Sequence, residues 1–245
     1  MLGTAQDITE QRRLDELRDT ILSAVSHELR TPLTAIVGFA QTLKERTLEP
    51  TLRTAVIESM FVQAQRLERL LADLLDLDRL RRGFVRPKFA ETDIASLVEQ
   101  VVAAHRDQVP IAVRVELAHA AVDAPKVERI VDNLIVNAVR HTPVGTEIAV
   151  RVERGEGGVT IAVDDRGPGV AREDREAIFE IFHRGTRSDY TAGTGIGLSL
   201  VAQFTALHGG RAWVQENPGG GASFRVFLPS NGSSPELPVT AELSS

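Results

Sequence analysis

The chain has 245 residues, enough for one large domain or two modest ones, and its 42% hydrophobic and 25% charged content is typical of soluble globular proteins. A formal net charge of −6 argues against nucleic acid as the main partner, and the absence of cysteine excludes disulfides and thiolate metal sites. The sequence contains no run of about 18 apolar residues, so it predicts no membrane span. We therefore expect a cytoplasmic chain, although the full-length protein could still be anchored in a membrane.

Residues 1–9 are predicted to be the remnant of an upstream domain. Asp7-Ile8-Thr9-Glu10 stands directly before a charged helical stretch and resembles the exit from a PAS sensor domain. A leader added for expression is the alternative interpretation of the same residues.

A helical hairpin is predicted over residues 10–84. Apolar residues three and four apart predict one helix from Glu10 to about Thr47 and another from Thr51 to about Arg82, with Pro50 breaking the run between them. A hairpin alone cannot bury both apolar stripes, so we expect a homodimer that forms a four-helix bundle. The stripe positions are Leu22, Val25, Leu29, Leu33, Ile36, Ala40 and Leu43, then Val56, Met60, Ala64, Leu67, Leu71, Leu74 and Leu77.

The first helix carries the segment Ser26-His27-Glu28-Leu29-Arg30-Thr31-Pro32. His27 and Thr31 are four apart and therefore share a face, which lies opposite the apolar stripe. Glu28 is adjacent in sequence and offers a proton acceptor, while Pro32 should bend the helix. An exposed histidine with its own base is typical of a nucleophile.

Residues 85–229 predict a second domain of α+β type. Helices are expected from Asp93 to about Asp107, from Pro125 to His141 and over 195–207, with a short one near 172–179. Alternating apolar residues predict strands at 111–117, 147–152, 159–163, 211–214 and 223–228. The tail, residues 230–245, is rich in Ser, Pro and Glu and is expected to be disordered.

Four segments of this second domain carry polar or glycine-rich patterns. Asn133 and Asn137 lie on one helix face, where two carboxamides can hold Mg²⁺ without adding negative charge; hydrogen bonds across the domain are the alternative. Asp165 to Gly169 follows a strand, and a buried carboxylate there can accept from an exocyclic amine, although it could be a simple turn. Phe179 and Phe182 precede Arg184, a guanidinium suited to phosphate. Gly193 to Leu198 opens a helix whose amide donors can face phosphates.

Each segment is ambiguous alone, but their order resembles one family. The histidine segment matches the H box of two-component sensor histidine kinases, and Asn133 to Ala138 matches the N box. The other three segments match the first glycine box, the F box and the second glycine box. The chain therefore resembles a histidine kinase transmitter: a dimeric phosphoacceptor hairpin followed by a GHKL-type (Bergerat) ATP-binding sandwich.

This resemblance implies roles for individual residues. His27 would be the phosphoacceptor, Glu28 the general base and Thr31 the residue that orients water to dephosphorylate a partner response regulator receiver domain. Asn137 would bind Mg²⁺, with Asn133 supporting it, and Asp165 would read the adenine amine. The remaining nucleotide contacts would be Arg140, His141, Gly167, Gly169, Arg184, Gly193, Thr194, Gly195, Gly197 and Leu198, and residues between Arg166 and Thr194 would form a lid over ATP.

Two alternatives remain open from the sequence. A GHKL ATPase of the chaperone or topoisomerase kind would use the same ATP boxes, but it has no use for the histidine segment. A catalytically silent module would bind ATP and dimerise without transferring phosphate.

Overall fold

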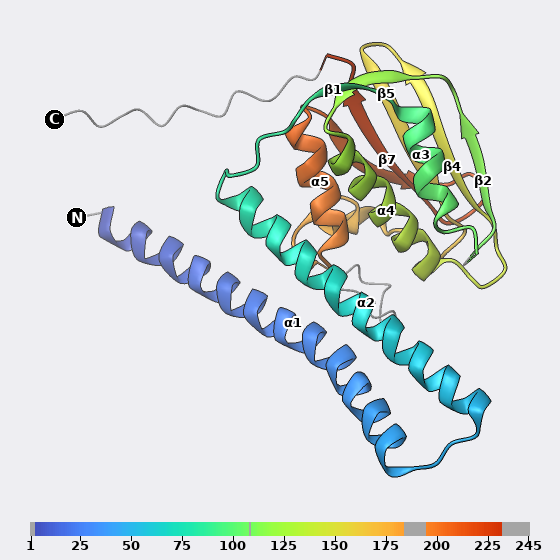
Figure 1. Cartoon of the computed structure of the whole chain (residues 1–245). Coiled ribbons are helices and arrows are strands. Elements are labelled where there is room, and N and C mark those ends of the chain that lie inside the picture. The colour runs from blue at the N-terminus through green and yellow to red at the C-terminus, as the bar shows by residue number, and fades with distance from the viewer. Residues whose placement is uncertain (1–2, 108, 184–194, 232–245) are drawn as a thin grey trace. The chain divides into compact units, whose positions relative to one another are not determined.

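The computed structural model describes residues 3–107, 109–183 and 195–231 (Figure 1). The chain divides into two compact units, residues 1–78 and residues 79–245. No helix within the described ranges is long and apolar enough to cross a lipid bilayer.

The first unit consists of two long helices, as the sequence predicts. Helix α1 (Gly3–Glu45) begins before the expected Glu10 and continues through Pro32 without ending there. Helix α2 (Pro50–Arg81) begins with a proline, which suits a first turn because the N–H that proline lacks would have no partner there. The connection, residues 46–49, sends the chain back in the opposite direction (Figure 1).

An ion pair joins the two helices of the hairpin. The Arg66 guanidinium (Nη2) lies 3.5 Å from the Glu28 carboxylate (Oε2). Several large apolar side chains nevertheless stay exposed, including Leu33 at 51% and Leu71 at 48%, both from the predicted stripes. Where the side chains of α1 and α2 are described, the other exposed large apolar residues are Val37, Leu52, Ile57, Phe61, Val62 and Leu75.

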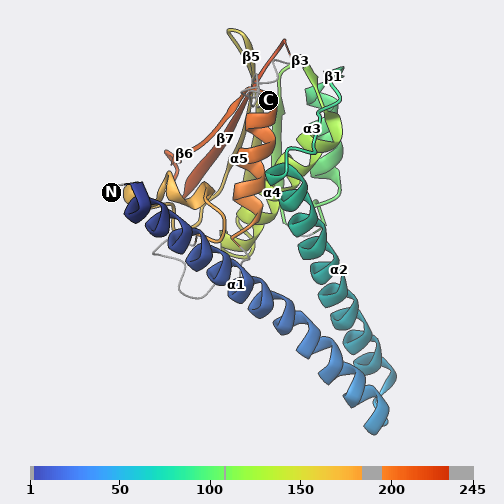
Figure 2. The ribbon, with the colours of Figure 1, turned by 90° about the vertical axis from the view of Figure 1, so that its left-hand side faces the viewer.

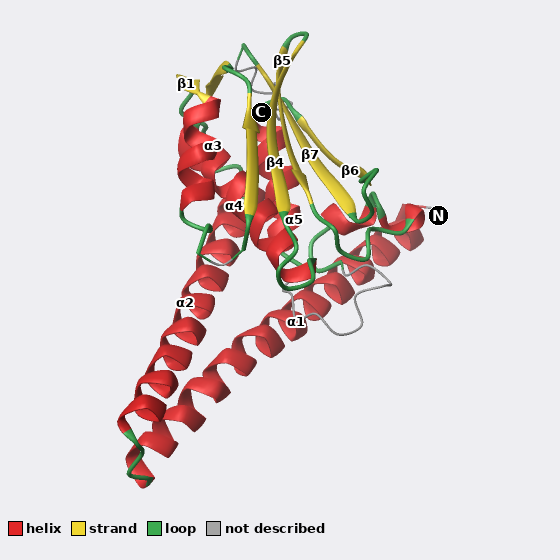
Figure 3. Ribbon diagram, turned by 90° about the vertical axis from the view of Figure 1, so that its right-hand side faces the viewer, coloured by secondary structure: helices red, strands yellow, loops and turns green. Residues whose placement is uncertain are grey.

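The second unit is a five-stranded mixed sheet with helices on one face. Its strands are ordered β2 (Ile111–Val115), β4 (Ile148–Gly155), β5 (Gly158–Asp164), β7 (Ala222–Pro229) and β6 (Arg211–Glu216). The β2–β4 pair is parallel and the others are antiparallel. Figure 2 shows the sheet on one side and α3 (Ile94–Ala103), α4 (Ala124–His141) and α5 (Gly197–Leu207) on the other, and β4, β7 and β6 can be followed in Figure 3.

The core of this unit lies between the helices and the sheet. Alternate residues of each central strand are buried, as a strand with one covered face requires: Ile148, Val150 and Val152; Val159, Ile161 and Val163; Phe224, Val226 and Leu228. Helix α4 meets them with residues three and four apart, namely Val127, Ile130, Val131, Leu134, Ile135 and Ala138. The expected fold class, a helical hairpin followed by an α/β sandwich, is confirmed.

Two short strands were not predicted. Strand β1 (Ala90–Asp93) pairs antiparallel with β3 (His119–Val122) in a separate two-stranded sheet. Ala, Glu and Asp are poor strand formers, so only the tertiary pairing makes these segments extended.

Helix α3 also ends earlier than expected, because His105 turns inward and its Nε2 lies 2.8 Å from the Asp132 carboxylate of α4.

Ser230 still belongs to the folded unit. Its N–H donates to the carbonyl oxygen of Gly157, and its carbonyl accepts from the N–H of Ala121. Disorder was expected over residues 230–245, of which 232–245 lie outside the described ranges.

A buried histidine connects the N-terminus of α4 with the C-terminus of α5. His208, 1% exposed, accepts a hydrogen bond at Nε2 from the N–H of Asp123, and its Nδ1 lies 2.7 Å from the carbonyl oxygen of Phe204. Since Nε2 accepts, Nδ1 must carry the proton, so the ring is neutral. The Asp123 carboxylate caps α4 and accepts from the N–H of Lys88 in the linker.

We expect His208 to make this unit less stable in mild acid. Burial lowers the pKa of His208 in the folded state, whereas the unfolded ring binds a proton below about pH 6.5. Its contribution is therefore complete above that pH and is lost as the pH falls. Urea unfolding followed by fluorescence of Trp213, the single tryptophan, should show a shallower decline between pH 7 and 5.5 in His208→Gln than in wild type. His208→Leu, which leaves the Asp123 N–H unpaired, should lose about 1–3 kcal/mol. Equal slopes in wild type and His208→Gln would contradict this assignment.

Candidate functional site

His27 is exposed on α1, as its position opposite the apolar stripe predicts. Glu28 is only 6% exposed and pairs with Arg66 inside the hairpin. The two side chains diverge because successive helix residues are rotated by about 100°. The imidazole is therefore exposed to solvent, and the roles of His27 as acceptor and Glu28 as base stay predictions.

Thr31 is exposed on the same face as His27. Its Oγ1 donates a hydrogen bond to the carbonyl oxygen of His27, 3.2 Å away. Such a bond to the residue four before it is common for helix threonines, and Thr42 makes the same bond to Gly38. The hydroxyl is thus near the histidine, and its role in dephosphorylation stays a prediction.

Helix α4 carries the predicted metal and phosphate residues of the second unit. Asn133 is buried, and its Nδ2 has no hydrogen-bond partner among the described residues. A Cβ built on Gly197, at the start of α5, would lie 3.0 Å from Asn133 Oδ1. Asn137, one turn later, is half-buried and Arg140 is exposed. The carboxamide of Asn133 therefore lies against the second glycine box.

His141, the last residue of α4, lies beside the first glycine box. A Cβ built on Gly167 would lie 2.5 Å from the His141 carbonyl oxygen, so only glycine allows this approach. Burial, with a smaller contribution from Arg140, lowers the pKa of His141, while Asp165 acts in the opposite direction.

Asp165 follows β5 and is buried, at 2% exposure. Its Oδ1 accepts hydrogen bonds from the N–H of Gly167 at 2.8 Å and of Ala222 at 3.1 Å. Both bonds that the carboxylate accepts from described residues go to Oδ1, which leaves Oδ2 for a ligand. Burial raises the pKa of Asp165, and the two N–H donors oppose that shift.

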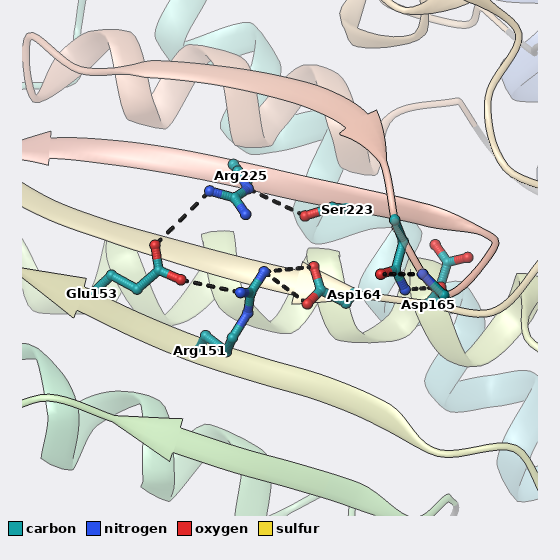
Figure 4. Close-up of polar contacts among 8 residues, drawn as sticks. Arg151, Glu153, Asp164, Asp165, Ser223 and Arg225 are labelled. Atoms are coloured by element: carbon teal, nitrogen blue, oxygen red, sulfur yellow. Dashed lines mark hydrogen bonds and ion pairs between the residues drawn. The ribbon is translucent and has the colours of Figure 1, made fainter.

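Asp164, the preceding residue, has a different partner. Its carboxylate pairs with Arg151 at 2.8 Å, and Arg151 also contacts Glu153 at 3.2 Å (Figure 4). Arg225 continues this network, with its Nη1 3.9 Å from Glu153 Oε2 and its Nε donating to the Ser223 hydroxyl. Adjacent aspartates therefore differ: one is neutralised by an arginine, and the other is held by backbone donors.

The F box and the second glycine box are in direct contact. The N–H of Phe182 donates to the carbonyl oxygen of Gly195, 3.0 Å away. Phe182 has a φ of 63°, which is rare for an aromatic residue and often marks a functional segment. Gly195 has a φ of 65°, and Leu198 lies half-buried in the first turn of α5. Arg184, Gly193 and Thr194 lie outside the described residues, as does the rest of the predicted lid from 184 to 194.

The structure thus brings the separated motifs of the second unit together. Asn133 lies against Gly197, His141 against Gly167, and Phe182 against Gly195. Gly169, with a φ of 70°, approaches Gly221 in the turn between β6 and β7. That turn, residues 217–221, was not among the predicted site residues, because Asn-Pro-Gly-Gly-Gly between two strands indicates only a hairpin loop.

Two family models match the chain. Residues 17–83 match the His Kinase A (phospho-acceptor) domain. Residues 122–232 match the Histidine kinase-, DNA gyrase B-, and HSP90-like ATPase.

Similar proteins carry both units. The sensor-like histidine kinase SenX3 of Mycolicibacterium smegmatis is 31% identical, over 91% of this chain and 60% of its own length. The alginate biosynthesis sensor protein KinB of Pseudomonas aeruginosa is 34% identical, over 91% of this chain and 39% of its own. The structure of full-length ShkA in complex with AMPPNP matches with a TM-score of 0.63 and 29% identity, over 89% of this chain and 47% of that one. The chain thus spans about 40–60% of the length of these relatives.

Proposed function

Since the chain belongs to the family of two-component histidine kinase transmitters, we propose that it is an ATP-dependent protein-histidine kinase that phosphorylates its own His27. The main support is the assembly of four motifs, distant in sequence, around Asp165 and the start of α5. The accessible imidazole on α1 supplies the acceptor.

The second unit is suited to bind ATP with Mg²⁺. Asp165 Oδ2 would accept from the adenine amine, and the half-buried, neutral His141 ring beside it would contact the base. The buried Nδ2 of Asn133 has no hydrogen-bond partner among the described residues, which supports a ligand there. We propose that Asn137, supported by Asn133, holds Mg²⁺, which would neutralise charge on the phosphates.

The glycine-rich start of α5 would hold the phosphates. The backbone donors of a helix N-terminus favour an anion, and we assign this role to Gly193, Thr194, Gly195 and Gly197, followed by Leu198. Gly167 and Gly169 would let the base approach the backbone, and Arg140 and Arg184 would contribute positive charge.

The transfer requires a neutral imidazole. The lone pair of the unprotonated ring nitrogen forms the new P–N bond while the bond between the γ-phosphorus and the bridging oxygen breaks and ADP leaves. The proton on the other ring nitrogen is then released. We propose Glu28 as its acceptor, which requires its ion pair with Arg66 to open.

We propose that the active form is a homodimer. The apolar residues that the hairpin leaves exposed, among them Leu33, Phe61 and Leu71, need a partner surface. A second hairpin would cover them in a four-helix bundle. The phosphoryl group would then pass from His27 to an aspartate of a response regulator receiver domain.

Thr31→Ala should keep autophosphorylation but slow dephosphorylation of the regulator. Loss of the hydroxyl removes the group proposed to orient the attacking water, so the decay rate of the phosphorylated receiver should fall roughly tenfold or more. Thr42→Ala is the matched control, because it removes the same kind of helix hydrogen bond elsewhere on α1. Identical decay rates in both variants would count against Thr31.

The kinase proposal is tested by incubating the chain with ATP labelled in the γ-phosphate. Label bound to the protein, stable in base and labile in acid, with Mg²⁺ required, supports transfer to histidine. ATP binding without any transfer would instead favour the silent module.

A further inference from the structure

The turn between β6 and β7, residues 217–221, packs against the loop that begins at Asp165. Within it, the N–H of Asn217 donates to the carbonyl of Gly221 at 3.2 Å, and the N–H of Gly220 donates to the carbonyl of Asn217 at 2.8 Å. Two backbone hydrogen bonds therefore close the turn. From this closed turn the Asn217 side chain reaches the main chain of Asp165, with Nδ2 2.9 Å from the carbonyl oxygen.

The orientation of the Asn217 carboxamide is determined by its two partners. A carbonyl oxygen can only accept and a backbone N–H can only donate. Nδ2 must therefore face Asp165, while Oδ1 accepts from the N–H of Gly219 at 3.4 Å. The side-chain oxygen of Asn217 supports the turn, and its side-chain nitrogen holds the loop that contains Asp165.

Asp165 is fastened to the same hairpin at three further points. Its N–H donates to the carbonyl of Ala222 at 2.8 Å, and its Oδ1 accepts from the N–H of Ala222 at 3.1 Å. Gly221 touches it without any space for a side chain, because a Cβ there would lie 2.2 Å from the Asp165 carbonyl oxygen. These contacts with Gly221 and Ala222 thus fix the direction of the Asp165 carboxylate.

We propose that Asn217 is a positioning residue that sets the adenine preference of the site. By holding the Asp165 carbonyl it fixes the direction in which Oδ2 meets the exocyclic amine. Guanine carries a carbonyl at that position, which a fixed carboxylate repels. The proposal rests on the proposed function, since it deepens the role of Asp165 in binding ATP.

The test compares ATP and GTP binding by the full chain with Mg²⁺, measured by titration calorimetry. Asn217→Asp keeps the acceptor for Gly219 but loses the donor to Asp165, and Asn217→Ala loses both without adding charge. Both variants should bind ATP roughly tenfold more weakly, as expected for one lost hydrogen bond of good geometry. GTP binding should change less, so the ATP-to-GTP affinity ratio should fall.

An unchanged ratio would overturn the proposal, whether both nucleotides bind as in wild type or both weaken equally. A wild-type chain that binds no ATP would refute the proposed function instead, which keeps the two failures distinct. Trp213 fluorescence during urea unfolding checks that each variant is folded.

A pair of glycine variants tests whether the position of the Asp165 main chain matters, without changing Asn217. Gly221→Ala places a methyl group against Asp165 and should lower ATP affinity by more than about tenfold. Gly220 has a similar φ, +85° against +91°, but a Cβ there meets no heavy atom within 4 Å. Gly220→Ala should therefore bind ATP within about twofold of wild type. Equal losses in both variants would attribute the effect to backbone strain and overturn the proposal.

Discussion

Replacing His27 with alanine is expected to abolish the acid-labile label that the chain takes from γ-labelled ATP. Alanine removes the imidazole lone pair that would attack phosphorus, and no other group at that position can form a P–N bond. Because the side chain is exposed and alanine favours helix, α1 should be unaffected. ATP binding, measured separately, should therefore equal that of wild type.

Ser26→Ala is the matched control for this experiment. Ser26 is also exposed and lies one residue before the histidine on the same helix. This variant should retain the label, and the label should have the acid lability of a phosphoramidate. Label that survives in His27→Ala would exclude this histidine as the acceptor.

Asp165→Asn is expected to weaken ATP binding roughly a hundredfold, or about 3 kcal/mol. The asparagine Oδ1 can still accept from Gly167 and Ala222, so the loop should keep its path. Its Nδ2, however, would present a donor where Oδ2 is proposed to accept from the adenine amine. Calorimetric titration with ATP measures this change directly.

The same substitution should not destabilise the protein at neutral pH. Burial raises the pKa of Asp165 above its unfolded value, so its contribution to stability is complete in acid and is lost as the pH rises through the folded pKa. At pH 7 the charged, buried carboxylate therefore lowers the free energy of unfolding, and asparagine removes that charge. Trp213 fluorescence during urea unfolding should show equal or greater stability.

Asp164→Asn is the control for the adjacent position. It removes a carboxylate of the same kind, but one that pairs with Arg151 away from Oδ2 of Asp165. ATP affinity should change by less than about threefold, a fraction of what one hydrogen bond contributes. Similar losses in both variants would indicate a general charge effect and contradict the specific role of Asp165.

Much of this architecture follows from periodicity. The apolar spacing along α4 predicts both the helix and the face that carries Asn133 and Asn137, and alternation predicts β4, β5 and β7. The order of five motifs predicts the family, which the comparisons confirm. Local patterns of this kind depend on residues close together in the sequence, so they can be recognised without a structure.

Long-range contacts could not be predicted in the same way. Strands β1 and β3 exist because they pair with each other, and the approach of Asn217 to Asp165 joins residues 52 positions apart. The ion pair between Glu28 and Arg66 joins two different helices, so it depends on where α2 lies. In each case the deciding partner is far away in the sequence.

The parallel pairing of β2 with β4 bears on how the chain matures during synthesis. A parallel pair needs a crossover, here through β3 and α4, so the central sheet must wait for contacts between distant segments. The helical hairpin precedes the sheet in the chain and consists of local structure, which forms quickly. A nascent chain should therefore present its dimerisation surface before its ATP lobe is complete, so that subunits can associate while neither is yet able to act.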